Sequence, residues 1–181
     1  MTDTAPKSGN LDVTLATWTF LLFDAGFVPA DAGVAAACRA LRAAGEGADL
    51  DTLGVALVAA LRPLLGEGEP GFAAVEACAR ALFGDEYAIG TDLGTAADRG
   101  ERVRAIRRYE FSRKLPWIAR IYDRAPSGRV GPLWVLVQWV HEQVHIMDPY
   151  PWDDVDEQVD VPVVDFMVKW ELAGCESVRI K

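Results

Sequence analysis

Two histidines and a glutamate lie close together in the segment His141-Glu142-Gln143-Val144-His145. In an α-helix, residues four positions apart lie on one face, so two imidazoles at this spacing can bind one divalent metal ion. The intervening glutamate can then reach a water molecule bound to that ion. The segment therefore supplies two candidate metal ligands, His141 and His145, and a candidate general base, Glu142.

The segment resembles the metal-binding helix of the zincin metallopeptidases, whose pattern places uncharged residues around His-Glu-x-x-His. Trp139, Val144, Ile146 and Met147 fit this pattern, whereas Gln138 departs from it. The resemblance covers roughly ten residues of the chain. It implies a bound zinc ion and a peptidase-like hydrolysis in which the metal lowers the pKa of a water molecule.

The third metal ligand must be a carboxylate, because the chain has only two histidines. Glu171 is the preferred candidate, since the zincin resemblance includes an arrangement in which a glutamate returns on the next helix. Asp165 and Asp148 are the alternatives. Iron is an alternative metal, because two histidines and one carboxylate also hold iron in non-haem oxygenases.

A second hypothesis involves no metal. His141, Glu142 and His145 would then form hydrogen bonds within a core, with partners such as Tyr109 or Arg113. The protein would be a non-enzymatic helical adaptor or assembly subunit, and it would bind a peptide or protein partner through the aromatic and acidic segment 149–162. Both hypotheses are open at this point.

Glycine, proline and capping side chains divide the first half of the chain into helices. The expected helices cover residues 10–23, 30–45, 51–65 and 70–84, followed by a loop at 84–94 and a helix at 95–115 that ends before Pro116. We expect a disordered tail at 1–9, an N-terminal helical domain at 10–84 and a C-terminal helical domain at 95–181. A weak similarity between the regions around Cys38 and Cys78 allows a duplicated helical hairpin.

The segment 132–149 is apolar on nearly all sides of a helical wheel, which indicates a buried central helix that carries the metal-binding motif. A short helical piece is expected at 117–124 and another helix at 163–172. The last residues, 177–181, fit a short strand, but no partner strand is evident. The sequence thus predicts a mainly α fold, a helical bundle.

The composition limits the choice of partners. The net charge of −9 and the pI of about 4.7 oppose binding to nucleic acid and to anionic membranes. A group of arginines between Arg99 and Arg108 alternates with glutamates, which favours a solvated helix face with salt bridges. Three widely spaced cysteines and a start without a signal-like pattern favour a cytoplasmic location, and no apolar stretch is long enough to span a membrane.

Overall fold

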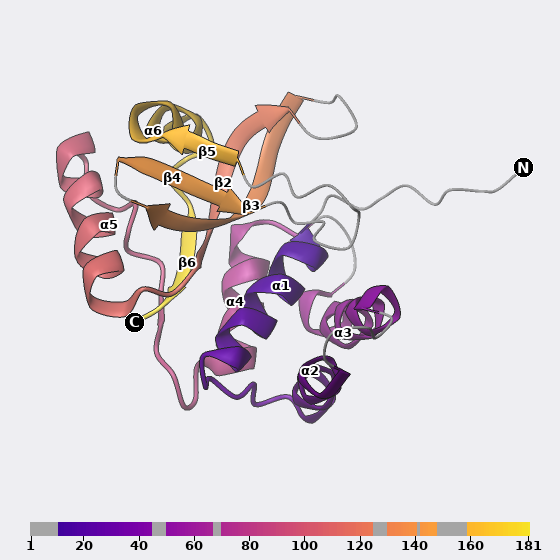
Figure 1. Ribbon diagram of the computed structural model, residues 1–181. Coiled ribbons are helices and arrows are strands. Elements are labelled where there is room, and N and C mark those ends of the chain that lie inside the picture. The colour runs from indigo at the N-terminus through magenta and orange to yellow at the C-terminus, as the bar shows by residue number, and fades with distance from the viewer. Residues whose placement is uncertain (1–10, 45–49, 67–69, 125–129, 141, 148–158) are drawn as a thin grey trace, which may run out of the picture.

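The computed structural model describes residues 11–44, 50–66, 70–124, 130–140, 142–147 and 159–181. Within these residues the chain forms helices on both sides of one sheet (Figure 1). In chain order, the elements are α1 (Leu11–Asp24), α2 (Ala32–Ala44), α3 (Leu50–Leu65), α4 (Phe72–Phe83), β1 (Ile89–Gly90), α5 (Arg99–Arg113), β2 (Trp117–Arg124), β3 (Val130–Val140), β4 (Gln143–Met147), β5 (Val159–Pro162), α6 (Val163–Leu172) and β6 (Ser177–Ile180).

The strands form a six-stranded sheet in the order β1-β6-β2-β3-β4-β5, and every pair of neighbours is antiparallel. Helices α1 to α4 lie together on one side of the sheet, whereas α5 and α6 lie on the other (Figure 1). The fold is therefore a layered α/β arrangement. The expectation of a mainly α helical bundle was wrong.

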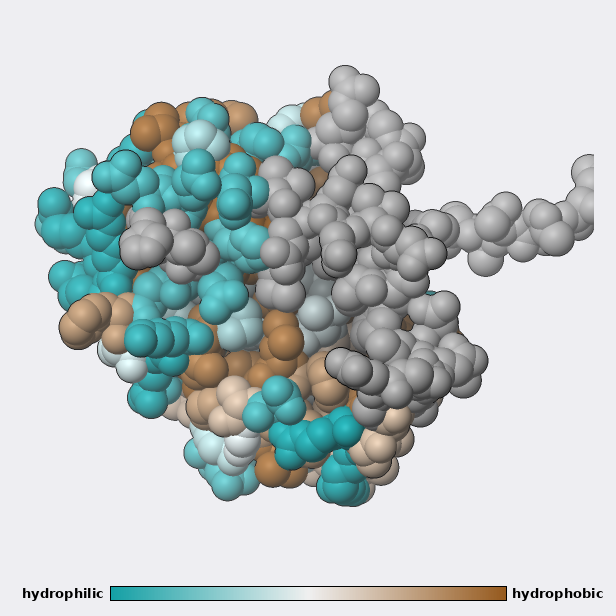
Figure 2. All heavy atoms as spheres, viewed as in Figure 1, coloured by the Kyte–Doolittle hydropathy of each residue, from teal (hydrophilic) through white to brown (hydrophobic). Residues whose placement is uncertain are grey.

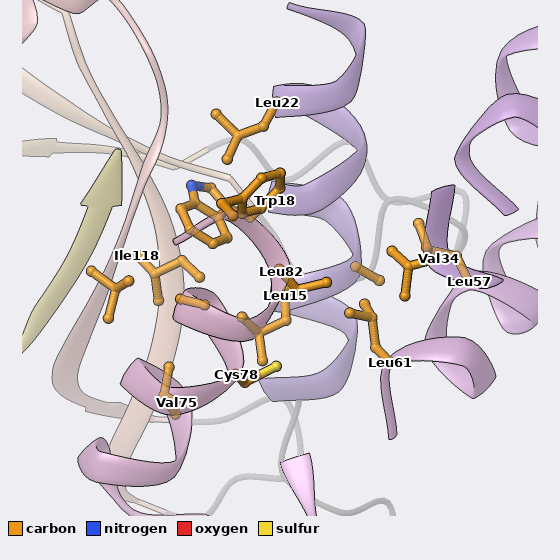
Figure 3. Close-up of a cluster of buried hydrophobic side chains, with 14 of the residues drawn as sticks. Leu15, Trp18, Leu22, Val34, Leu57, Leu61, Val75, Cys78, Leu82 and Ile118 are labelled. Carbon is orange, nitrogen blue, oxygen red and sulfur yellow. The ribbon is translucent and has the colours of Figure 1, made fainter. Parts of the chain in front are cut away.

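The first core lies between the sheet and the layer α1–α4, with α1 at its centre. Trp18 of α1 is fully buried, and its indole Nε1 donates a hydrogen bond to the carbonyl oxygen of Pro116 over 3.0 Å. Figure 3 shows Trp18 on the same side of α1 as the strand residue Ile118, while Leu57 and Leu61 of α3 lie on the other side. Burial on both sides explains why α1 is apolar around most of its circumference.

The second core lies between the opposite face of the sheet and helices α5 and α6. Its centre is aromatic: Trp117 of β2 packs edge-to-face against Phe166 and Trp170 of α6, with ring centroids 5.9 and 5.5 Å apart. Such pairs contribute more than the burial of their apolar area alone. The sheet is thus covered on both faces.

Strand β3 occupies most of the segment expected to be the motif helix. Trp134 and Leu136 belong to the first core, whereas Val135 and Val137 belong to the second. Successive side chains of a strand point to opposite faces, so a strand covered on both faces is apolar at every position. The continuous apolar pattern had this cause, and the expectation of a helix at 132–149 was wrong.

The helical piece expected at 117–124 was also wrong, whereas the short strand expected at 177–181 is present as β6. The segment 117–124 is strand β2 and pairs with β3 along its whole length. The last strand, β6, does have partners, because it lies between β1 and β2. The helices expected in the first 115 residues and at 163–172 correspond to α1 to α6, with ends that differ by a few residues. No helix in the described ranges is long and apolar enough to cross a membrane.

Candidate functional site

The His-Glu-x-x-His segment lies in a β-hairpin and not on a helix. Strand β3 ends at Val140 and β4 begins at Gln143, and these two residues pair with each other. The side chain of Glu142 is exposed at the connection, and its carbonyl oxygen accepts a hydrogen bond from the backbone N–H of Val163. His141 lies outside the described residues. The helical spacing on which the two-ligand argument depended is therefore absent.

His145 and Glu171 lie on opposite sides of the sheet. Val144 and Ile146 of β4 point into the second core, so His145 between them points to the face that α1–α4 cover. Its Nδ1 lies 2.8 Å from Oδ1 of Asp160, directly across from it on β5. Glu171 belongs to α6, which covers the other face. The two residues cannot hold the same ion in this fold.

Glu171 instead joins α6 to α5. Its carboxylate accepts hydrogen bonds from Nη2 of Arg99 and Nη2 of Arg102, both over 2.5 Å. The hydrogen bond from Arg99 is the largest cause that lowers the pKa of Glu171, to about 2. Arg99 also donates from Nε over 2.9 Å, so the carboxylate accepts three hydrogen bonds from two guanidinium groups and is an ion-pair bridge between helices.

The resemblance to zincins is overturned by these placements. The described part of the chain contains no group of three or more His, Cys, Asp or Glu side chains that could hold a metal ion. Of the alternative third ligands, Asp165 is exposed in the first turn of α6, and Asp148 lies outside the described residues. The segment 149–162, the expected partner-binding surface of the adaptor hypothesis, also lies mostly outside them.

A different site lies between α5 and the end of β6. It is a pocket of about 290 Å³, which we call the α5–β6 pocket. Its charged and hydroxyl-bearing lining residues include Asp92, Arg108, Tyr109, Arg113, Arg179 and Lys181. Four of these side chains are cations and one is a carboxylate, in a chain whose net charge is −9. The pocket is therefore a local positive region on an acidic protein.

Helix α5 supplies five of the lining residues, Ala105, Arg108, Tyr109, Ser112 and Arg113, because of how it sits on the sheet. Its first turn is capped by Asp98, whose side chain accepts a hydrogen bond from the backbone N–H of Glu101. Ile106 and Tyr109 of α5 are buried, and most of its other residues carry charged or polar side chains. Figure 2 shows hydrophilic side chains gathered over α5. Arg108 and Arg113 make no ion pair with any other described side chain.

Strand β6 supplies the inner cation, Arg179. Its side chain is 14% exposed, and its Nη2 donates to both carboxylate oxygens of Asp92, over 2.9 and 3.1 Å. The guanidinium also lies over the ring of Tyr109. The other donor of that edge, Nε, is buried and has no hydrogen-bond partner in the described part of the structure.

Tyr109 is the second buried polar group of the pocket. The residue is 4% exposed, and among the described residues its hydroxyl has no hydrogen-bond partner. Burial raises the pKa of the phenol, so the hydroxyl stays protonated and keeps a hydrogen to donate. Buried polar groups without partners are uncommon in folded proteins and need an explanation. Two of them occur here on residues that line one pocket.

Gly90, next to the pocket, leaves room for two of the lining side chains, those of Asp92 and Lys181. A Cβ atom added at Gly90 would lie 2.9 Å from Oδ1 of Asp92 and 3.0 Å from Cε and Cγ of Lys181. The chain is held at this edge by β1 pairing with β6 and by the backbone N–H of Lys181, which donates to the carbonyl oxygen of Ala88 over 2.8 Å. The absence of a side chain at position 90 therefore lets Asp92 and Lys181 pack closely.

The arginines between Arg99 and Arg108 divide between two roles. Arg104 binds Glu101 over 2.6 Å on the exposed face, as expected for a solvated helix face with salt bridges, whereas Arg99 and Arg102 bind Glu171 of α6. Arg108 instead lines the pocket with residues far away in the sequence. The sequence contained no local signal for this, because Arg179 and Lys181 meet α5 only through the position of β6.

The comparisons with known proteins give no family: the chain matches no protein-family model, no curated protein and no solved structure. The fold and the site together define a layered α/β protein with a small basic pocket.

Proposed function

We propose that the protein is a non-enzymatic adaptor that binds an anionic group of a protein partner in the α5–β6 pocket. The observation that carries this proposal is the set of four cationic side chains around one small pocket. An acidic protein repels anions at long range, so a local group of cations selects a ligand that brings its negative charge to this place.

A polypeptide partner is favoured over a free ion by the surface beside the pocket. Phe111 of α5 is 89% exposed, and it follows Arg108 by three positions, so the two side chains are neighbours on the helix surface. An exposed aromatic side chain beside a charged pocket is the type of residue that anchors protein interfaces. A free anion would make no use of Phe111.

Metal-dependent hydrolysis with Glu142 as the base remains a prediction from the sequence. We do not favour it, because His145 and Glu171 lie on opposite faces of the sheet and Glu171 is bound to two arginines. Cytoplasmic location also remains a proposal. It is supported by three free cysteines, of which Cys38 and Cys78 are buried.

The proposal is tested with poly-L-glutamate as an acidic polypeptide. We expect its titration into ¹⁵N-labelled protein to shift the amide signals of α5 and β6. The double variant Arg108→Gln/Arg113→Gln removes two exposed cations, so we expect at least tenfold weaker binding without loss of the fold. Phe111→Ala is expected to weaken binding several-fold.

Arg39→Gln is the matched control. Arg39 is an exposed arginine on α2, which is not part of the pocket, and its loss removes one positive charge from the protein. It should leave the affinity within a factor of two. Arg108→Gln alone removes the same single charge from the pocket; equal losses in Arg39→Gln and in Arg108→Gln would show a nonspecific charge effect, and the proposal would then be wrong.

A further inference from the structure

We propose that the polypeptide partner binds along the outer face of α5 through an acidic segment with one apolar side chain, which packs on the ring of Phe111. The outer face consists of Arg104, Arg107, Arg108, Phe111 and Lys114. This inference rests on the proposed function above. It names the chemistry of the partner and extends the contact beyond the α5–β6 pocket, because Phe111 and Lys114 do not line that pocket.

Phe111 is the most exposed of the large apolar side chains in the part of the chain that the structure describes. It is 89% exposed, whereas the next, Val55 of α3, is 68% exposed. The buried residues of α5 are Ile106 and Tyr109, and Phe111 lies on the opposite side of the helix from both. The ring therefore makes little contact with its own protein, and its surface is accessible to a partner.

Cations surround this ring on the helix surface. Residues three and four positions apart are neighbours on a helix, so the neighbours of Phe111 include Arg107, Arg108 and Lys114. All three are exposed. Arg104 lies one turn before Arg108, and its side chain is 58% exposed. An apolar ring is thus set among positive charges, in a protein whose net charge is −9.

The charges and the ring together select the partner. A segment with carboxylates on both sides of one apolar residue matches the outer face, because the carboxylates then lie beside the cations while the apolar side chain covers Phe111. An anion without an apolar group would leave the ring in water. An apolar segment without acidic residues would displace water from the cations and supply no opposite charge.

Other anionic partners fit the outer face less well. From Arg104 to Lys114 the face is roughly 15 Å long, given the rise per residue of an α-helix, so a long nucleic acid would also meet the acidic remainder of the protein. A helix that binds a membrane needs an accessible apolar face, whereas the apolar side of α5 is packed in the second core. Two copies joined through α5 would bring cations against cations.

The test is an isothermal titration of the full chain with three acetylated and amidated peptides. The first peptide has four glutamates on each side of a central leucine, the second has serine in place of the leucine, and the third has serines in place of the glutamates. We expect the first to bind about tenfold more tightly than the second, because only the leucine covers the ring. The third peptide should show no measurable binding.

Phe111→Ala tests the apolar contact, and Lys114→Gln tests the charge beside it. Phe111→Ala should reduce the preference for leucine over serine to below about threefold, whereas Phe111→Leu keeps an apolar side chain and should preserve most of it. Lys114→Gln should weaken both acidic peptides equally and leave the preference unchanged. Val55→Ala is the control, because it removes an exposed apolar side chain from α3. Amide spectra establish that the variants are folded.

The outcomes separate the two proposals. Equal affinity for the leucine and serine peptides, or a preference that persists in Phe111→Ala, would overturn this inference and leave the adaptor proposal in place. No binding of either acidic peptide would overturn this inference, and the absence of any shift with poly-L-glutamate would overturn the adaptor proposal as well.

Two further measurements test the class of partner. Tighter binding to a DNA duplex or to phosphatidylserine vesicles than to the leucine peptide would overturn the polypeptide partner in both proposals. Sedimentation of the unmodified chain alone as a dimer, and of Phe111→Ala as a monomer, would identify a second copy as the occupant of the outer face and overturn the separate partner.

Discussion

The guanidinium Cζ of Arg179 lies 4.9 Å from the centroid of the Tyr109 ring, so a residue of β6 contacts a residue of α5 across the second layer of the fold. A cation over an aromatic face is attractive, and more so when both groups are shielded from water. Arg179 is further fixed by Asp92, which follows β1. Helix α5, strand β6 and the segment after β1 are thus joined at the α5–β6 pocket.

Replacing Tyr109 by Phe should stabilise the ligand-free protein. The hydroxyl is buried without a partner in the described structure, so its removal relieves a desolvation penalty. We expect the free energy of unfolding to rise by about 1 kcal/mol, measured by urea denaturation. Tyr122→Phe, at an exposed position, should change it by less than about 0.5 kcal/mol. A less stable Tyr109→Phe would mean that the hydroxyl does have a partner.

The bridge through Glu171 should make stability depend on pH in the acid range. The pKa of Glu171 falls from its ordinary value of 4.5 to about 2 in the folded protein, mainly because Arg99 hydrogen-bonds to it. Between these values the unfolded chain binds more protons, so the stabilisation is present above pH 4.5 and is lost as the pH falls towards 2.

Glu171→Gln tests this dependence. We expect a lower melting temperature than that of the unmodified protein at pH 7, and a difference that becomes smaller as the pH falls from 4.5 to 2. Glu86→Gln replaces an exposed carboxylate outside this bridge and should not show the effect. A difference that is independent of pH would argue against the Arg99 and Arg102 ion pairs.

Gly94 is expected to tolerate no side chain. A Cβ atom at this position would lie 2.0 Å from the carbonyl oxygen of Cys175 and 2.8 Å from its Cβ, and backbone cannot move as easily as the end of a flexible side chain. We expect Gly94→Ala to lower the free energy of unfolding by about 3 kcal/mol or more. Gly131→Ala is the matched control, because nothing lies within 4 Å of its added Cβ atom. Similar losses in both variants would contradict the close approach.

The two buried cysteines, Cys38 and Cys78, should be unreactive in the native protein. Burial raises the pKa of the Cys38 thiol to about 11 and that of Cys78 to about 12, so almost no thiolate is present at pH 7 or 8. We expect iodoacetamide to leave Cys38 and Cys78 unmodified in the native protein and to modify all three cysteines in denaturant. Peptide mass spectrometry identifies the sites. Rapid native labelling of Cys78 would show that the first core opens.

The helices of the first half could be predicted from the sequence because their limits are local. Glycine, proline and capping side chains mark where α1 to α4 begin and end, and these signals need no knowledge of the rest of the fold. The structure gives α2 as Ala32–Ala44 and α4 as Phe72–Phe83, close to the expected segments.

The strands could not be predicted from periodicity, because both faces of the sheet are covered. A strand with one exposed face alternates between apolar and polar residues, but β3 is buried on both sides and shows no alternation. The β-branched and aromatic residues of Leu133-Trp-Val-Leu-Val-Gln-Trp-Val140 were the available signal for a strand. Because this segment is a β-hairpin and not a helix, the four-residue spacing of the motif does not place two ligands on one face.

The α5–β6 pocket could not be predicted from the sequence, because its residues come from segments that are far apart in the chain. Arg108 and Arg179 are far apart in the chain, and they meet only because β6 enters the sheet between β1 and β2. Reading α5 by itself, the arginines fit a solvated face; Arg104 does pair within the helix with Glu101, whereas Arg99 and Arg102 pair with Glu171 of α6.

The insertion of β6 between β1 and β2 also constrains how this chain can fold during synthesis. The backbone hydrogen bonds of helices α1 to α4 and of the hairpin of β2 and β3 join residues that are close in the sequence, so these elements do not need β6 in order to form. Strand β1, however, pairs with β6, so it stays without its neighbour until residues 177–180 have emerged. Closure of the sheet, together with assembly of the basic pocket, is therefore a late event on the path from nascent chain to native protein.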